Sequence, residues 1–194
     1  MPTRQKAKLS RRQFLVTTGK TVMAVAAYKC MCGEACAAML PNACVDAVCG
    51  IYCGACSALM ESVASEIKCL GCRSTQKPPS YAPQCEVRQC AAAKRVQSCG
   101  LCKAYPCEKI KAFFTDQPKY GLREKNLNTI RDKGLQAWLR EQKARWTCQK
   151  CKTPFGYGAQ ACQKCGEKVY SDAEEFEAFK KEKVEKAGGR DQKS

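Results

Sequence analysis

The chain has 194 residues, with 18 cysteines, no histidine and a formal charge of +16 at pH 7. Without histidine, the serine and cysteine catalytic triads and the histidine-based metallohydrolase motifs are excluded. Four sites that each hold a divalent ion with four thiolates would lower the charge to about +8. The excess lies mostly in Lys6–Arg12 and Lys180–Lys193, so the middle offers no obvious phosphate-binding surface and nucleic acid is disfavoured as a partner.

Cysteine at this density organises a small fold, either as disulfides or as thiolates bound to metal. Five Cys-x2-Cys pairs favour metal, because disulfide frameworks usually space their half-cystines more widely. The tight turn of such a pair brings two sulfurs onto one ion. We therefore expect metal to replace part of the hydrophobic core.

The first predicted element, residues 1–28, resembles a twin-arginine export signal. Ser10-Arg11-Arg12-Gln13-Phe14-Leu15 matches the S-R-R-x-F-L core, and a moderately apolar stretch with small residues follows it. This pathway exports folded proteins that often already carry metal, which predicts a periplasmic protein. The alternative is a basic amphipathic helix on a cytoplasmic protein. No other stretch is apolar for the roughly 20 residues of a membrane span, so none is expected in the mature chain.

Residues 29–48 add four cysteines at irregular spacing: Cys30, Cys32, Cys36 and Cys44. They suffice for one more metal site or for two disulfides, and their spacing does not choose between the two.

Residues 49–116 are predicted to form a cysteine-rich metal-binding domain. Short helices are expected over Ser57–Ile67 and Glu86–Val96, and a third with Pro106 in its first turn. Ten cysteines would supply two metal sites and two spare thiols, with the pairing left open: Cys49, Cys53, Cys56, Cys69, Cys72, Cys85, Cys90, Cys99, Cys102 and Cys107.

The metal of this domain is not fixed by spacing. Cys49-x3-Cys53-x2-Cys56 has the spacing by which radical S-adenosylmethionine enzymes hold a four-iron cluster, but the chain has no room for the barrel that such enzymes need. A [4Fe-4S] cluster without that enzyme remains an alternative to zinc, because both use four thiolates.

A linker is predicted at Asp116–Gly121, within a helical connector over residues 117–145. Two short amphipathic helices broken near Gly134 are expected there, with Trp138 in the core. At the far end, residues 171–194 should form a charged helix and tail, which the capping box Ser171-x2-Glu174 would begin.

Residues 146–170 carry the arrangement of a zinc ribbon, in which two Cys-x2-Cys turns face each other. The four ligands would be Cys148, Cys151, Cys162 and Cys165. Gly166 follows the last ligand, where the absence of a side chain lets backbone N–H groups turn toward sulfur. Four protein ligands leave no place for water, so this Zn²⁺ site should be structural.

The central motifs together carry a resemblance. They are Cys49-Gly50-Ile51-Tyr52-Cys53-Gly54-Ala55-Cys56, Cys69-Leu70-Gly71-Cys72, Cys85-x4-Cys90, Cys99-Gly100-Leu101-Cys102 and Pro106-Cys107-Glu108-Lys109. From Cys49 to about Phe114 the chain resembles the domain of unknown function 3795 family, small cysteine-rich prokaryotic proteins to which metal-binding cysteines are ascribed. The resemblance implies metal sites and a cytoplasmic placement, against the export signal, and it implies no activity.

The sequence thus predicts a small α+β metalloprotein: a cysteine-knuckle domain with short helices, a helical connector and a C-terminal zinc ribbon. We expect a metal-binding protein, with zinc first, in an accessory or interaction role beside an unidentified protein partner. An enzyme is disfavoured. The alternatives are an iron–sulfur electron-transfer protein and a thiol–disulfide oxidoreductase, which would need one accessible Cys-x2-Cys with a depressed thiol pKa.

Overall fold

The computed structural model describes residues 43–62 and 65–188. The predicted export signal, Cys30, Cys32 and Cys36 lie outside the described residues. Two 3₁₀ turns, η1 (Cys53–Ala55) and η2 (Cys99–Leu101), and three short helices, α2 (Ser57–Met60), α3 (Glu86–Ala93) and α4 (Glu108–Lys111), belong to the cysteine-rich segment. Three longer helices follow, α5 (Pro118–Lys133), α6 (Leu135–Arg145) and α7 (Asp172–Gly188).

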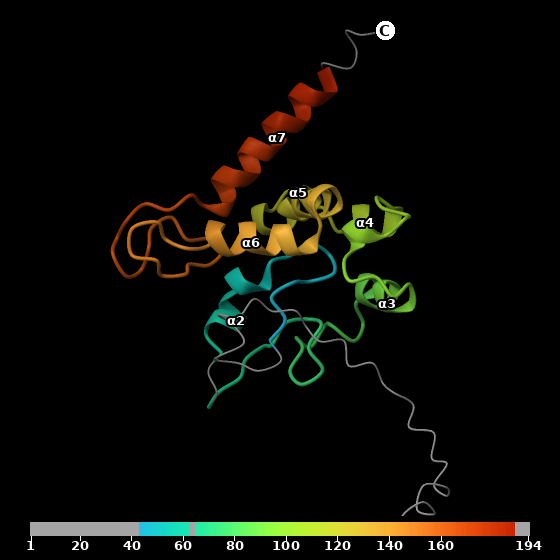
Figure 1. Cartoon of the computed structure of the whole chain (residues 1–194), viewed down its shortest axis with the longest axis horizontal. Helices are drawn as coiled ribbons and strands as arrows, with labels where there is room; N and C mark the ends of the chain where they lie inside the picture. The colour runs from blue at the N-terminus through green and yellow to red at the C-terminus, as the bar shows by residue number, and fades with distance from the viewer. Residues whose placement is uncertain (1–42, 63–64, 189–194) are drawn as a thin grey trace, which may run out of the picture.

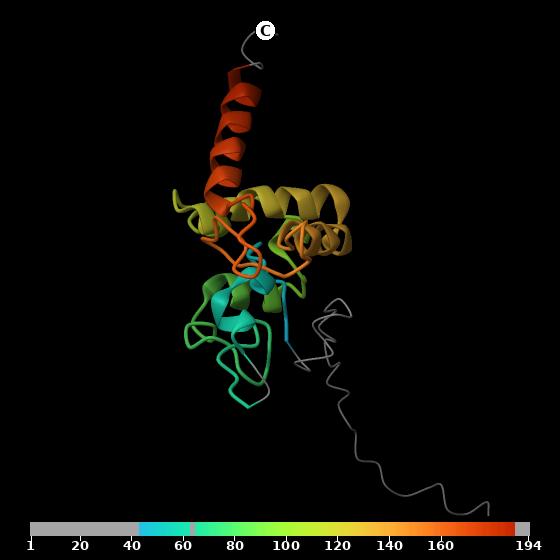
Figure 2. The same cartoon turned by 90° about the vertical axis from the view of Figure 1, so that its left-hand side faces the viewer.

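The fold is mostly helical. Helices α5 and α6 lie over the cysteine-rich segment, the loops of residues 146–171 lie at one end of α6, and α7 projects away from the body (Figures 1 and 2). Within the described ranges no extended strand forms, and β-structure consists of isolated bridges, among them the antiparallel pairs Asp46–Tyr52, Thr147–Pro154 and Ala161–Lys168. The predicted α+β class is therefore not confirmed. No helix in the described part of the chain combines the length and apolarity needed to cross a bilayer.

Helix α5 packs closely against the cysteine-rich segment through two glycines. A Cβ atom at Gly50 would lie 2.9 Å from the carbonyl oxygen of Arg123, and one at Gly100 would lie 2.5 Å from that of Leu127. The buried side chain of Asn126 donates from Nδ2 to the carbonyl oxygen of Gly50 at 2.8 Å. The core therefore runs without a break from the segment into α5 and α6, and Trp138 at its centre is fully buried, as expected.

The break between α5 and α6 falls at Gly134, as predicted, where a φ of +85° suits a residue without a side chain. The linker predicted at Asp116–Gly121 is wrong in its second half, because α5 already begins at Pro118. Proline is favoured at the first position of a helix, where its missing N–H group has no partner to lose.

The predicted helix over Ser57–Ile67 is also too long, because α2 ends at Met60. The Ser62 hydroxyl lies 2.7 Å from the carbonyl oxygen of Ala58 and accepts hydrogen bonds from the backbone N–H groups of Lys68 and Cys69 at 3.0 Å. A serine that bonds a returning loop in this way competes with the next helical turn.

Helix α3 falls within its predicted range, but Pro106 does not lie in the first turn of α4. It follows a cis peptide bond with Tyr105 and precedes Cys107, the N-cap residue.

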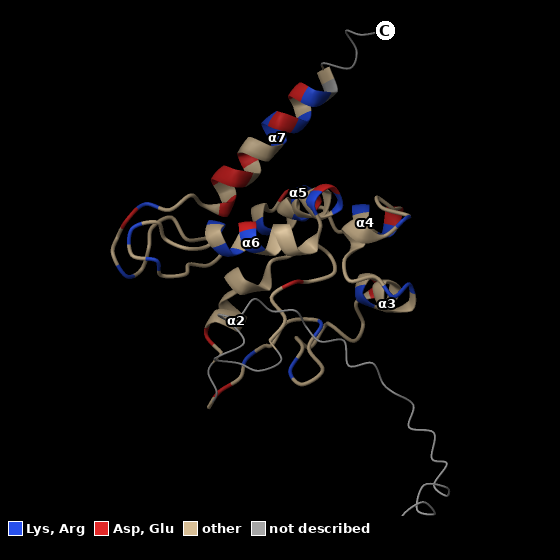
Figure 3. Ribbon diagram, in the orientation of Figure 1, with Lys and Arg blue, Asp and Glu red and all other residues tan. Residues whose placement is uncertain are grey.

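Helix α7 begins with the predicted capping box. Glu174 Oε2 accepts from the Ser171 backbone N–H at 2.9 Å, and Ser171 Oγ accepts from the Glu174 N–H at 3.2 Å. These bonds and the neighbouring Lys168 lower the pKa of Glu174 to about 2. Acidic residues cluster in the first turn, while the lysines appear along the projecting half, where two further Glu residues lie among them (Figure 3). This order complements the helix dipole.

Candidate metal centre

Four cysteine sulfurs converge in the C-terminal loops. The Sγ atoms of Cys148, Cys151, Cys162 and Cys165 all lie within 4.8 Å of one another. The distance between Cys148 and Cys165 is 3.7 Å and that between Cys151 and Cys162 is 3.5 Å. A tetrahedral Zn²⁺ with Zn–S bonds of about 2.3 Å would separate its sulfurs by about 3.8 Å. The four thiols are free, and their spacing therefore fits a metal ion rather than disulfides.

Two copies of one short motif build this centre. Cys148-Gln149-Lys150-Cys151 and Cys162-Gln163-Lys164-Cys165 are identical in sequence. In the first, the N–H of Cys148 donates to the Thr153 carbonyl at 2.9 Å; in the second, the N–H of Cys162 donates to the Glu167 carbonyl at 2.8 Å. Each turn is thus the tip of a small hairpin.

The residue after each second cysteine has a left-handed backbone. It is Gly166 in the second turn, with a φ of +71°, as its predicted role requires. In the first turn it is Lys152, with a φ of +58°. Both residues donate a backbone hydrogen bond of 2.9 Å to the carbonyl of the first cysteine of their turn. The left-handed conformation is therefore part of the motif, and Lys152 adopts it despite its side chain.

Thr153 favours a thiolate in the first turn. Its Oγ1 lies 3.3 Å from Cys151 Sγ. The side-chain hydroxyl and the backbone N–H of Thr153 lower the pKa of Cys151 to about 6. Since metals bind the deprotonated thiol, this stabilisation assists coordination. The spacing of the cysteines did not single out Thr153.

The ten central cysteines are free and half-buried. Among the residues that the structure describes, no three of them come as close together as the four sulfurs of residues 146–170, the loop segment called the ribbon below. They do share one electrostatic environment. Burial, and then the neighbouring thiolates, raise the pKa of Cys53 well above its ordinary value and that of Cys72 and Cys99 to about 12. Their grouping into metal sites stays a prediction.

Cys44 is disulfide-bonded, which agrees with the disulfide alternative for this residue rather than with an additional metal site. Its backbone N–H donates to the Leu70 carbonyl at 2.8 Å, so the chain before Cys49 lies against the Cys69-x2-Cys72 loop.

The ribbon docks on the first central cysteine turn through Tyr157. The Tyr157 hydroxyl donates to the Tyr52 carbonyl at 3.1 Å and accepts from the Tyr52 N–H at 3.2 Å, across 105 residues of sequence. Its backbone N–H donates to the Ala55 carbonyl at 3.0 Å. The Trp146 ring packs on the Tyr157 ring at a centroid distance of 4.5 Å. Nothing in the local sequence around Tyr157 indicates this distant partner.

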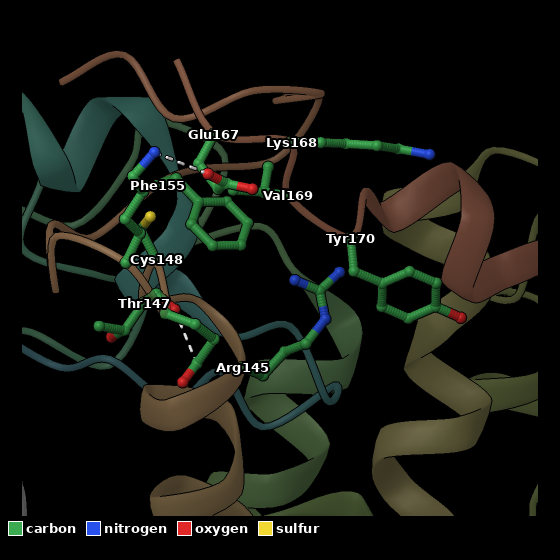
Figure 4. A pocket seen from close by; sticks show the side chains of 10 residues that line it. Arg145, Thr147, Cys148, Phe155, Glu167, Lys168, Val169 and Tyr170 are labelled. Carbon is green, nitrogen blue, oxygen red and sulfur yellow. Dashed lines mark hydrogen bonds and ion pairs between the residues drawn. The ribbon is translucent and has the colours of Figure 1, made fainter. Parts of the chain in front are cut away.

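A cavity of about 650 Å³ lies beside the ribbon, against Cys148 and Phe155. Figure 4 shows Arg145 reaching toward the ring of Tyr170. Each cation at the wall has a carboxylate partner: Arg145 pairs with Glu175 at 2.8 Å, Lys150 with Glu167 at 3.1 Å and Lys168 with Glu174 at 3.0 Å. These pairs join α6, the ribbon and α7, so we assign the cavity a structural role.

No curated protein and no solved structure matches this chain. One family model matches, over residues 45–112, and it is described as a protein of unknown function (DUF3795). The match covers all ten central cysteines and ends before α5, so the ribbon lies outside it. The cysteine-rich segment of this chain is thus similar to the DUF3795 family.

Proposed function

We propose that this protein binds zinc, with one structural Zn²⁺ held by Cys148, Cys151, Cys162 and Cys165. The observation that carries the proposal is the convergence of the four free sulfurs to separations near the edge of a zinc–thiolate tetrahedron. With four protein ligands the shell is closed, so the ion would hold the two hairpins together and would not activate water. Zinc ribbon is the name that fits this arrangement.

The central cysteines are proposed to bind two further ions in an accessory protein that acts beside a protein partner. Their burial and mutual electrostatic contact support a shared metal environment, and an iron–sulfur cluster is the second candidate for it. A thiol–disulfide oxidoreductase is less well supported, because burial raises the pKa of Cys53, Cys72 and Cys99, whereas an attacking thiol needs a lowered one.

The test is elemental analysis of protein purified without oxygen, compared with a ribbon variant that combines Cys162→Ser with Cys165→Ser. We expect the variant to lose one equivalent of zinc, because two of four ligands are gone. Gln163→Ala is the control, because Gln163 is exposed between two of the ligands and is not itself a ligand, and it should keep the full zinc content.

Equal zinc in the parent and the ribbon variant would contradict the ribbon site. If the protein contained iron and showed visible absorption that dithionite bleaches, the bound group would be an iron–sulfur cluster and not zinc. Disulfides between the four ribbon cysteines in the native protein would overturn the proposal altogether.

A further inference from the structure

We propose that the end of α6 and the first cysteine turn form a groove that binds the phosphate backbone of a nucleic acid. The groove has a volume of about 390 Å³, and none of its lining residues is acidic: Arg140, Lys143, Ala144, Thr147, Gln149 and Lys152. It goes beyond metal binding and depends on the ribbon ion only for the shape of the turn.

Its three cations are exposed and have no ion pair within the described part of the chain. Arg140 and Lys143 lie three residues apart on α6, and Lys152 reaches the groove from the cysteine turn. The acidic neighbours are engaged elsewhere: Glu141 pairs with Lys133 at 2.9 Å and Glu167 with Lys150 at 3.1 Å. The cations of the groove thus remain available to an external anion, unlike those of the larger cavity.

The groove is held in shape by hydrogen bonds between its two walls. Gln149 Nε2 donates to the carbonyls of Thr147 at 3.1 Å and Ala144 at 3.5 Å. The Thr147 hydroxyl donates to the Lys143 carbonyl at 2.7 Å. These bonds tie the end of α6, which carries Lys143, to the start of the turn that carries Lys152, so the backbone of the groove is preorganised.

Lys152 gives an independent reason to look for a ligand here. Its position is left-handed, and the equivalent position in the identical second turn is a glycine. The left-handed conformation is unfavourable for residues with a Cβ atom. A lysine in a strained position where glycine would serve indicates that its side chain has a use, since such strain gathers at functional sites.

The wider surface is also basic. Between Leu135 and Tyr170 the chain has seven basic and two acidic residues. Four thiolates and one Zn²⁺ would add a net charge of −2, which leaves the region positive. Figure 3 shows Lys and Arg at the end of α6 that faces the ribbon. The expectation that the basic excess lies mostly at the ends of the chain, with no obvious phosphate-binding surface in the middle, therefore misses this surface.

The lining favours a nucleic acid over a membrane. The groove exposes mostly carbon surface, but its lining residues are Ala144 and long or polar side chains, and none is the large apolar side chain on which binding to a lipid surface draws. A shallow groove with three cations that are free of ion pairs among the described residues instead suits a phosphodiester backbone, with little dependence on sequence.

The test measures fluorescence anisotropy of a labelled mixed-sequence single-stranded oligonucleotide with the full-length, metal-loaded chain. Three phosphate contacts predict a slope of log affinity against log salt of about −2, or a loss of about 20-fold between about 50 and 200 mM salt. Lys152→Gly should weaken binding about two- to fivefold and flatten the slope by about 0.7. Because it also removes backbone strain, its melting temperature should equal or exceed that of the parent.

Lys164→Gln is the matched control, because Lys164 is exposed, belongs to the second turn and lies outside the groove. It removes the same charge and should bind more tightly than Lys152→Gly. The double variant Arg140→Gln/Lys143→Gln should lose most of the remaining affinity.

If Lys152→Gly and Lys164→Gln lowered the affinity for the oligonucleotide equally, the proposed binding groove would be refuted. The binding would then be general attraction to a basic protein. Absence of oligonucleotide binding at low salt would overturn it as well, as would groove-dependent binding to phosphatidylserine vesicles without binding to the oligonucleotide. Zinc content measured on each variant keeps this result separate from the metal proposal: a parent without zinc refutes the metal site and says nothing against the basic groove.

Discussion

Tyr157 shows how one side chain can join two cysteine modules. Its hydroxyl satisfies both backbone groups of Tyr52, the residue that precedes Cys53. The adjacent Gly156 allows this approach, because a Cβ atom there would lie 2.9 Å from the Ala55 carbonyl oxygen. Lys119 Nζ lies 5.1 Å from the centre of the Tyr157 ring and 3.8 Å from Cys56 Sγ. The ribbon and the first central turn thus share a polar contact as well as a packed one.

Tyr157→Phe should lower the free energy of unfolding by about 1–3 kcal/mol, because it removes the two hydrogen bonds between the Tyr157 hydroxyl and the Tyr52 backbone in a partly buried place. Urea denaturation of the metal-loaded protein measures this change. Tyr170→Phe is the control, since the Tyr170 side chain is exposed, and it should stay within about 0.5 kcal/mol of the parent. Similar values for both variants would show that the Tyr157 hydroxyl is not a stabilising link.

At the scale of elements, α5 can pack closely on η2 because Gly100 in that turn has no side chain. Gly100 presents bare backbone to Leu127 and Ile130, both fully buried in α5. Ser98 supports the same turn, because its hydroxyl accepts from the Gly100 N–H at 3.3 Å. Close packing against α5 therefore explains why position 100, between Cys99 and Cys102, is a glycine, whatever its role in metal binding.

Gly100→Ala should destabilise the protein by about 1–3 kcal/mol, since the added methyl group forces α5 away from a close-packed seat. The midpoint of thermal or urea unfolding reports it. Leu101→Ala, at the exposed neighbouring position, should change stability by no more than about 0.5 kcal/mol. Equal losses at the two positions would mean that α5 does not rest on Gly100 as described.

For the whole molecule, the two tryptophans report on different regions. Trp146 is buried in the ribbon against Phe155 and Tyr157, whereas Trp138 lies in the common core against Tyr52. In the ribbon variant Cys162→Ser/Cys165→Ser, a protein with Trp146 alone (Trp138→Phe) should show red-shifted emission, because the small ribbon has little core without its ion.

The companion protein, with Trp138 alone (Trp146→Phe), should change far less, since the helices that bury Trp138 do not need the ribbon sulfurs. Parallel shifts of both tryptophans would indicate that the ribbon ion supports the entire fold. No shift in either would indicate that the ribbon keeps its shape without metal.

Features fixed by neighbours in the sequence could be predicted, and those fixed by distant contacts could not. The spacing of Cys148, Cys151, Cys162 and Cys165 indicated their convergence, and Gly134 indicated the break between helices. The end of α2 was missed because Ser62 bonds a loop that returns from Lys68 and Cys69. The same limit applies to Tyr157, whose partner lies 105 residues away.

The seat of α5 on Gly50 and Gly100 has a practical consequence for the segment that resembles DUF3795. That resemblance stops at residue 112, yet Leu127 and Ile130, which cover the segment, come later in the chain. A recombinant fragment that ends at residue 112 would expose the hydrophobic surface that α5 covers in the full chain. Such an exposed surface promotes aggregation. A fragment that keeps this packing continues through α6, so the end of the similarity and the end of the packed core do not coincide.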